Sequence, residues 1–372
     1  MSDRTVSLSL YRRVGLFGTI AVVLLGIEHF GRYDLLGIAV QNGVDYHTAT
    51  GRLIRPTSID ETQYMSYVQR FRGVPIAELP EVWWPFNNRT AIPFLASRLP
   101  FRDEGVAIAV TNLVVYIAAI WIILDVLRRR NVTKEAFLLT AILLVVNWNT
   151  AWFSTGVLID PGVLLFFSIS CWLICADRVH WLIPLMLLGY PVKEPALGVV
   201  AIVAVWAFAD VAQRRRHMVI FGGTLIAAVV SFLIFHSLLV PDQSFDDTPR
   251  FGVLFSNLEP VALAALFMSF GPILLFALAR IRQQLRNQGL RTLVQDPMIV
   301  GFGLVIALIG YASLGADLSP RLFFPALPFA TVLAADGLDN SAQKWTKRFF
   351  ALPIINKLFR PDALDAVQTA EA

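Results

Sequence analysis

The chain has 372 residues, of which 56% are hydrophobic and only 16% are charged, and its mean hydropathy is +0.63. A soluble domain carries about a quarter charged residues, so this composition excludes an ordinary soluble protein, and the long apolar blocks are typical of a polytopic membrane protein. The formal net charge of +4 is small and its basic residues cluster between apolar blocks, which excludes a nucleic-acid-binding surface as their main role.

Basic residues between the apolar blocks predict the membrane topology. Arg4, Arg12 and Arg13 place the N-terminus in the cytoplasm, because basic residues favour the inner side. We expect about ten spans, alternating so that every short inner loop is basic. The block 180–192 is short and is interrupted by prolines, so the span count between 180 and 211 stays open. The predicted spans cover residues 14–30, 105–127, 136–153, 157–176, 180–192, 195–211, 218–240, 258–279, 298–314 and 322–338.

These spans define the predicted fold class as an all-α polytopic membrane protein. Residues 1–340 form the transmembrane domain, 31–104 form a large first extracytoplasmic loop, and 341–372 form a cytoplasmic tail. The first apolar block lacks a small-residue cleavage site, so we interpret it as an uncleaved span. The expected location is the plasma (inner) membrane, with both termini cytoplasmic.

The first loop contains a predicted helix. Ser58 followed by Glu61 fits a capping box, so a helix should begin at about residue 59. Its apolar side chains fall three and four positions apart, on one face. We expect this helix to lie in the membrane interface with its aromatic side down, and Trp83 and Trp84 to anchor at the same depth. The apolar face consists of Tyr64, Tyr67, Val68 and Phe71.

Polar residues gather at the outer ends of the predicted spans, where charge is costly and usually functional. Their common depth predicts an outward-facing polar pocket at the membrane boundary. Each of these residues also has a purely structural interpretation. Asp160 before Pro161 is compatible with a helix N-cap, Lys193 with a solvated turn, and Arg321 with contact to lipid phosphates. The residues concerned are Glu28, His29, Asp60, Glu61, Asp160, Lys193, Glu194 and Arg321.

Such a pocket suits sugar transfer from a polyprenyl-phosphate carrier. A carboxylate accepts the proton of the attacking hydroxyl, and cations stabilise the leaving phosphate. We expect Asp60 to be the base, with Glu61 as its neighbour or as a ligand of the donor sugar. Lys193 and Arg321 are expected to hold the phosphate, and Tyr64 to flank the sugar ring.

The order of these features resembles the GT-C superfamily of polytopic glycosyltransferases, over roughly residues 1–338. The resemblance is carried by five short stretches, and it implies an extracytoplasmic site to which Arg89, Asp160 and Glu194 also contribute as substrate-binding residues. In many members the catalytic acid follows the first span closely, so Asp34 remains the alternative base. The five stretches are 60–64 (DETQY), 85–89 (PFNNR) with 93–96 (PFLA), Asp160, Lys193-Glu194 and 321–325 (RLFFP).

The expected partners are membrane lipid, the lipid-linked sugar donor and an unidentified glycan, lipid or protein acceptor, without nucleic acid. Cys171 and Cys175 are interpreted as small apolar helix residues, and no cofactor is expected. A divalent cation among the outer acids has no support from ligand spacing. The alternatives are a transporter or flippase, an O-antigen polymerase or ligase, and a non-catalytic membrane scaffold.

Overall fold

The computed structural model describes residues 6–31, 46–47, 53–54, 59–75, 78–79, 83–84, 86–210, 212–238, 243–244, 259–312 and 320–341. Within these ranges the protein is helical, apart from four strands of two residues each. Strands β1 (Tyr46–His47) and β2 (Leu53–Ile54) pair antiparallel, and β3 (Trp83–Trp84) and β4 (Gln243–Ser244) pair in parallel. The predicted tail lies almost wholly outside the described residues.

Four of the described helical segments are long and apolar enough to cross a membrane: Leu8–His29, Glu104–Arg129, Arg214–His236 and Arg321–Asp339. Three shorter apolar helices accompany them, at Asp160–Cys175, Glu194–Ala209 and Pro297–Tyr311. This confirms the all-helical, membrane-type architecture. The long segments belong to α1 (Leu8–His29), α4 (Glu104–Arg129), α11 (Arg214–Leu238) and α17 (Leu327–Ser341), the last preceded by the 3-10 helix η6 (Pro320–Ala326).

Several predicted spans are broken into pieces. The third consists of α5 (Lys134–Val145) and α6 (Trp148–Phe153), because the Asn147 side chain accepts from the backbone N–H of Asn149 and starts a new helix. The eighth divides at Gly271, whose φ of 54° lies in the left-handed region that glycine tolerates. It consists of α13 (Pro260–Phe270) and α14 (Pro272–Gln288).

The fifth predicted span is the most interrupted. It comprises the 3-10 helix η4 (Val179–Trp181), α8 (Leu182–Met186) and α9 (Gly189–Val192), and its two prolines lie in α8 and α9. The remaining elements are α2 (Ile59–Phe71), η3 (Phe86–Asn88), α3 (Ala91–Ser97), α7 (Asp160–Cys175), η5 (Glu194–Leu197), α10 (Gly198–Ala209), α15 (Leu290–Gln295) and α16 (Pro297–Ala312).

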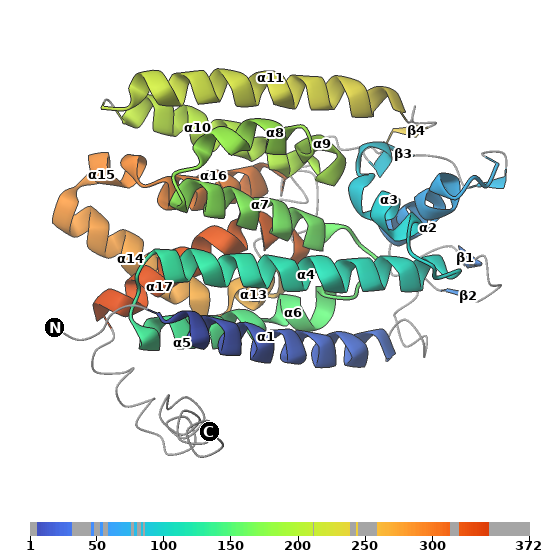
Figure 1. Ribbon diagram of the computed structural model, residues 1–372, viewed down its shortest axis with the longest axis horizontal. Helices are drawn as coiled ribbons and strands as arrows, with labels where there is room; N and C mark the ends of the chain where they lie inside the picture. The colour runs from blue at the N-terminus through green and yellow to red at the C-terminus, as the bar shows by residue number, and fades with distance from the viewer. Residues whose placement is uncertain are drawn as a thin grey trace, which may run out of the picture.

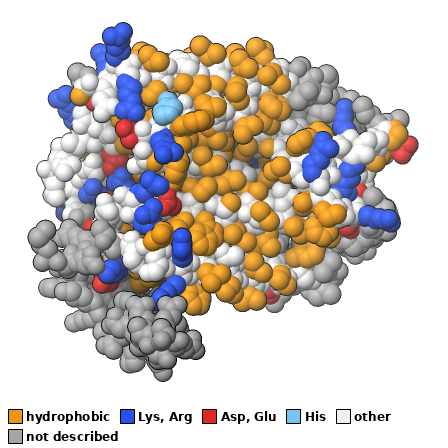
Figure 2. Space-filling model, viewed as in Figure 1, with side chains coloured by type: hydrophobic (Ala, Val, Ile, Leu, Met, Phe, Trp, Pro, Cys, Tyr) orange, Lys and Arg blue, Asp and Glu red, His pale blue; other side chains and the backbone are white. Residues whose placement is uncertain are grey.

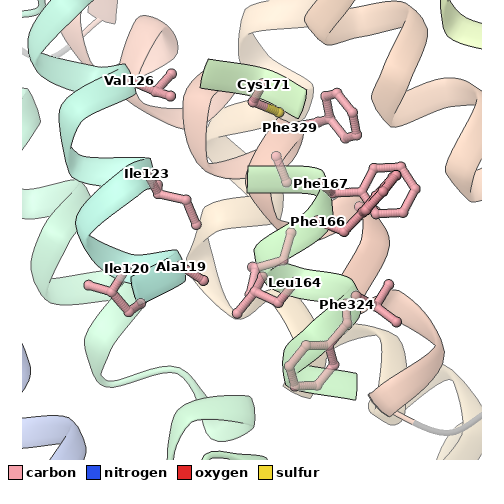
Figure 3. Packing of buried hydrophobic residues seen from close by; sticks show 14 of the residues in the cluster. Ala119, Ile120, Ile123, Val126, Leu164, Phe166, Phe167, Cys171, Phe324 and Phe329 are labelled. Carbon is pink, nitrogen blue, oxygen red and sulfur yellow. The ribbon is translucent and has the colours of Figure 1, made fainter. Parts of the chain in front are cut away.

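The long helices lie alongside one another as a bundle, with α2 and α3 at one end and α14 and α15 towards the other (Figure 1). In the core, α4 faces α7, and Phe324 and Phe329 pack beyond them (Figure 3). The bundle surface carries a band of apolar side chains, with charged side chains at both ends (Figure 2). This distribution is the one that a lipid bilayer selects.

The two ends of the bundle differ in charge. We call one the basic end, because arginines gather where α4, α11 and α14 begin or end, as the left of Figure 2 shows. The other is the α2 end, where α1 ends and α4 and α7 begin (Figure 1). The arginines of the basic end are Arg128, Arg129, Arg130, Arg214, Arg215, Arg216, Arg280, Arg282 and Arg286.

The helix predicted in the first loop exists, but its surroundings differ from the prediction. Helix α2 begins at Ile59 as expected. Its aromatic face does not lie down on lipid, because Tyr64, Tyr67 and Val68 are fully buried against protein, where α2 packs on α3 and α4. Its polar side is covered too, since Asp60 and Gln63 are buried. An interfacial helix and a core helix share one amphipathic pattern, so only the packing distinguishes them. The side chains of Trp83 and Trp84 lie outside the described residues.

Candidate functional site

Three ion pairs lie at the α2 end, and each joins segments that are distant in sequence. Arg321 of η6 binds Asp60 of α2, with Nη1 2.5 Å from Oδ2. The Lys193 Nζ lies 2.7 Å from Oδ1 of Asp160, and the Arg89 Nη2 lies 3.0 Å from Oε2 of Glu194. All six charged residues are ones that the sequence analysis selected.

Asp160 is the most deeply placed of these acids. It occupies the first turn of α7, but Ile159 is the N-cap residue and the Asp160 carboxylate binds Lys193, so the N-cap interpretation is wrong. Its side chain is only 2% exposed. A carboxylate buried to this extent requires a cation beside it.

The Lys193 side chain is only 12% exposed, so it does not lie in a solvated turn. It connects α9 to η5 in extended backbone. Burial lowers the pKa of Lys193, and the positive charges of Arg89 and Arg321 lower it further, while Asp160 opposes them. The Lys193 ammonium is therefore paired with the Asp160 carboxylate and lies within electrostatic range of two other cations, Arg89 and Arg321.

The pair between Arg89 and Glu194 is bidentate and is linked to α2. Arg89 Nε donates to both Glu194 carboxylate oxygens at 3.1 Å, and Nη1 donates to the Tyr64 hydroxyl at 3.5 Å. The guanidinium also lies over the Phe86 ring, 5.2 Å from its centroid. Burial alone lowers the pKa of Arg89, but Glu194 and Tyr64 outweigh it and raise this pKa well above its ordinary value.

Electrostatic interactions join the three pairs into one group. Asp160 interacts with Arg321 and Arg89 besides Lys193. Burial raises the pKa of Tyr64, with further contributions from Asp60 and Asp160 that Arg89 opposes. We call this group the acid–base cluster, and it consists of Asp60, Tyr64, Arg89, Asp160, Lys193, Glu194 and Arg321.

The acid–base cluster has balanced charge, and two of its side chains are partly exposed. Its three carboxylates meet three cations. The side chains of Glu194 and Arg321 are 29% and 28% exposed, whereas Asp160 lies beneath them. A ligand arriving from solvent or lipid would therefore meet Glu194 and Arg321 first.

Hydrogen bonds fix α2 against the start of α4, which holds Asp60 in position. The Gln69 side chain donates to the Glu104 carboxylate. Arg72 donates to the backbone carbonyls of Phe101 and Arg102, at 2.6 and 2.9 Å. The helix that carries Asp60 is thereby joined to the start of α4.

His29, one of the predicted pocket residues, lies outside the acid–base cluster, as do the buried Asn147 and Asn149. His29 Nδ1 lies 3.2 Å from Oγ1 of Thr155. Asn147 and Asn149 both donate to the Ser269 backbone carbonyl at 3.0 Å, so they join α6 to α13. These residues connect helices, as buried polar groups in membrane bundles do.

Two of the predicted catalytic residues, Asp34 and Glu61, do not belong to these three ion pairs. Asp34 lies outside the described residues. Glu61 follows Asp60 in the first turn of α2 and is half-buried. Asn88 and Tyr190 were not predicted as site residues, although Asn88 lies in the stretch 85–89; they lie beside each other, next to Arg89 and Glu194. The position of Asn88 directly before Arg89 is the signal that was available.

The described residues contain no group of three or more His, Cys, Asp or Glu side chains that could hold a metal ion. The side chains of the acid–base cluster are carboxylates, guanidinium groups, an ammonium and a phenol. Comparison with protein-family models, curated proteins and solved structures finds no match for this chain.

Proposed function

We propose that this protein is an integral membrane glycosyltransferase that moves a sugar from a polyprenyl-phosphate donor to an extracytoplasmic acceptor. The observation that carries the proposal is the acid–base cluster at one end of an apolar bundle, in which the partly exposed Arg321 is paired with the buried Asp60. A lipid phosphate travels at this depth, and its sugar needs both a base and cations. The layout similarity to the GT-C superfamily supports the same reaction class.

The proposed topology has ten crossings, with the basic end in the cytoplasm. Seven of them use the long and shorter apolar helices, and three use the broken segments α5–α6, η4–α9 and α13–α14. Broken helices are tolerated in membranes where neighbouring protein satisfies the freed backbone groups. The basic end then follows the positive-inside rule, and the acid–base cluster faces the extracytoplasmic side of the plasma membrane.

The proposed reaction is a single displacement at the anomeric carbon. The acceptor oxygen forms a bond to that carbon, and the bond from the carbon to the phosphate oxygen breaks, so the phosphate leaves with the electron pair. Asp60 accepts the proton of the acceptor hydroxyl, and Arg321 and Lys193 stabilise the phosphate. Tyr64, Glu61 and Glu194 border the space for the sugar, and Asp34 is the alternative base.

The pair between Asp60 and Arg321 gives this proposal a definite order of events. In the structure each group neutralises the other, with 2.5 Å between Nη1 and Oδ2. A donor phosphate that binds Arg321 competes with Asp60 for the same guanidinium. Binding of the donor thus releases the carboxylate towards the acceptor, which makes the base available only when the donor is present.

The test is transfer of radiolabelled sugar from a panel of polyprenyl-phosphate sugars by the purified protein in lipid vesicles. Asp60→Asn should reduce transfer by at least about a hundredfold, the range of a general base, while the variant inserts and purifies normally. Glu78→Gln is the matched control, because Glu78 is an exposed acid of the same loop. Arg321→Ala should weaken use of the donor.

The outcomes separate the parts of the proposal. Full activity of Asp60→Asn, with loss of activity in Asp34→Asn, would move the base to Asp34. Unchanged donor kinetics in Arg321→Ala would remove its phosphate role. If the wild-type protein transferred no sugar from any member of the panel, the proposed reaction would be wrong.

A transporter or flippase is the second candidate, because the breaks at η4–α9 and α13–α14 resemble the discontinuous helices of transporters. It predicts that vesicles containing the protein move a lipid-linked sugar across the bilayer without forming a new glycosidic bond. The same vesicles distinguish the two candidates when product and sidedness are measured together.

A further inference from the structure

A second polar site lies at the basic end, far along the bundle from the acid–base cluster. It is an open cavity of about 360 Å³ between the C-terminal ends of α4 and α7, the segment before α5, and helices α14 and α17. Nothing in the proposed reaction uses it. Its lining consists of Arg129, Arg130, Val132, Cys175, Arg280, Asp336 and Asp339.

The two carboxylates of this cavity already have donors. Asp336 binds Arg130, with Nη2 2.5 Å from Oδ2 and Nε 3.2 Å from Oδ1. Asp339 Oδ1 accepts the backbone N–H of Thr133 at 2.9 Å, which fixes the start of α5. Asp336 is therefore already paired with a cation, whereas Asp339 is bound, among the described residues, only to a neutral backbone N–H.

The Arg129 guanidinium has hydrogen-bond donors that its described contacts do not use. Its Nε donates to Oδ2 of Asp125 at 2.6 Å, and its guanidinium lies over the Trp172 ring, 5.1 Å from the centroid. Asp125 is shared with Arg128, so this acid faces two cations. Each guanidinium has five N–H donors, and a single Asp125 carboxylate cannot accept from all of them.

Arg280 is the least satisfied group in the cavity. Its Nε is buried and has no hydrogen-bond partner among the described residues. No ion pair within the described part of the chain includes it, although the Asp336 carboxylate is near enough to interact with its charge. A buried guanidinium N–H without an acceptor is costly, and a bound anion would supply the acceptor.

We propose that this cavity binds a phosphate-bearing anion, a phosphate ester of the kind carried by anionic phospholipid headgroups or by small soluble phosphates. Three guanidinium groups face two carboxylates, one of which is already paired with Arg130, and Arg recognises phosphate oxygens through paired N–H donors. Basic pockets between membrane helices at the cytoplasmic boundary are sites where lipid headgroups bind. The site is independent of the reaction proposed at the opposite end.

The experiment measures the thermal unfolding of the purified full-length protein in an uncharged detergent. The additions are short-chain phosphatidylglycerol, phosphatidylcholine with the same chains, and inorganic phosphate at equal concentrations. Arg280→Gln is the test variant, and Arg282→Gln is the matched control, because Arg282 is exposed on the same helix. Native mass spectrometry counts bound lipid in parallel.

We expect phosphatidylglycerol to stabilise the wild-type protein and Arg282→Gln, and phosphatidylcholine not to. Arg280→Gln should bind at least about tenfold more weakly, as expected for loss of charge-assisted hydrogen bonds. Stabilisation by inorganic phosphate that equals that by phosphatidylglycerol, and that Arg280→Gln abolishes, supports the site with a soluble phosphate as its ligand. Equal responses of Arg280→Gln and wild type, or no response to either anion, would overturn the proposal.

Discussion

The buried pair of Asp160 and Lys193 yields the prediction that follows most directly from the structure. Replacing Lys193 with Met keeps an unbranched side chain of similar length and removes the charge. It leaves the Asp160 carboxylate, 2% exposed, without the ammonium that now lies 2.7 Å from it. An uncompensated buried charge is among the most destabilising changes in a protein.

Breaking a buried ion pair by removing one partner costs about 3–5 kcal/mol of unfolding free energy. Here Arg321 and Arg89 also act on the Asp160 charge, which reduces the cost. Both of those cations already have their own carboxylates, so their help is limited. We therefore expect Lys193→Met to lose about 3 kcal/mol, the lower end of that range.

The assay is reversible unfolding of the purified protein by SDS in mixed micelles, followed by tryptophan fluorescence. The control Arg102→Met removes an exposed cation at the same end of the bundle and should change stability by less than about 0.5 kcal/mol. The double variant with Asp160→Asn should lose less than the sum of the single variants, by about 1–3 kcal/mol. That difference measures the pair itself.

A loss in Lys193→Met no larger than that in Arg102→Met would refute this reasoning. Strict additivity of Lys193→Met and Asp160→Asn would do the same, because it would mean that the two groups do not interact in the folded protein.

Three further predictions concern close packing and hydrogen bonding in the bundle. Gly301→Ala should destabilise the protein by about 1–3 kcal/mol, because the new Cβ would overlap the ring of the fully buried Phe329. Gly303→Ala, on the same helix, meets nothing within 4 Å and should instead stabilise by about 0.5–1 kcal/mol. Tyr116→Phe should cost about 1 kcal/mol, since its buried hydroxyl lies 2.8 Å from Oγ1 of Thr150. SDS titration measures all three.

Each of these variants has a control in the same protein. Tyr311→Phe removes a hydroxyl from a side chain that is 70% exposed and should leave stability unchanged. Equal effects of Tyr116→Phe and Tyr311→Phe would contradict the buried hydrogen bond. Equal effects of Gly301→Ala and Gly303→Ala would contradict the close packing of α16 on α17.

The sequence predicted the membrane-type helical fold because hydropathy is a local property of the chain. It also selected Asp60, Asp160, Lys193 and Arg321, because charges beside apolar spans are few and costly. It did not predict which acid meets which cation, since those partners are up to 261 positions apart. It indicated the interruption of the fifth span through its prolines but did not predict the breaks in the third and eighth spans, which depend on the side-chain cap of Asn147 and the positive φ of Gly271.

Local patterns alone thus determined the apolar composition, the basic end, the helix that begins at Ile59 and the scarcity of charge within the spans. The tertiary structure decided that the aromatic face of this helix is covered by protein and that Asp60 is bound to Arg321. It also decided that Arg280 has a buried Nε without a partner in the described chain. The physical reason is that burial and pairing are properties of neighbours in space, and sequence patterns record only neighbours along the chain.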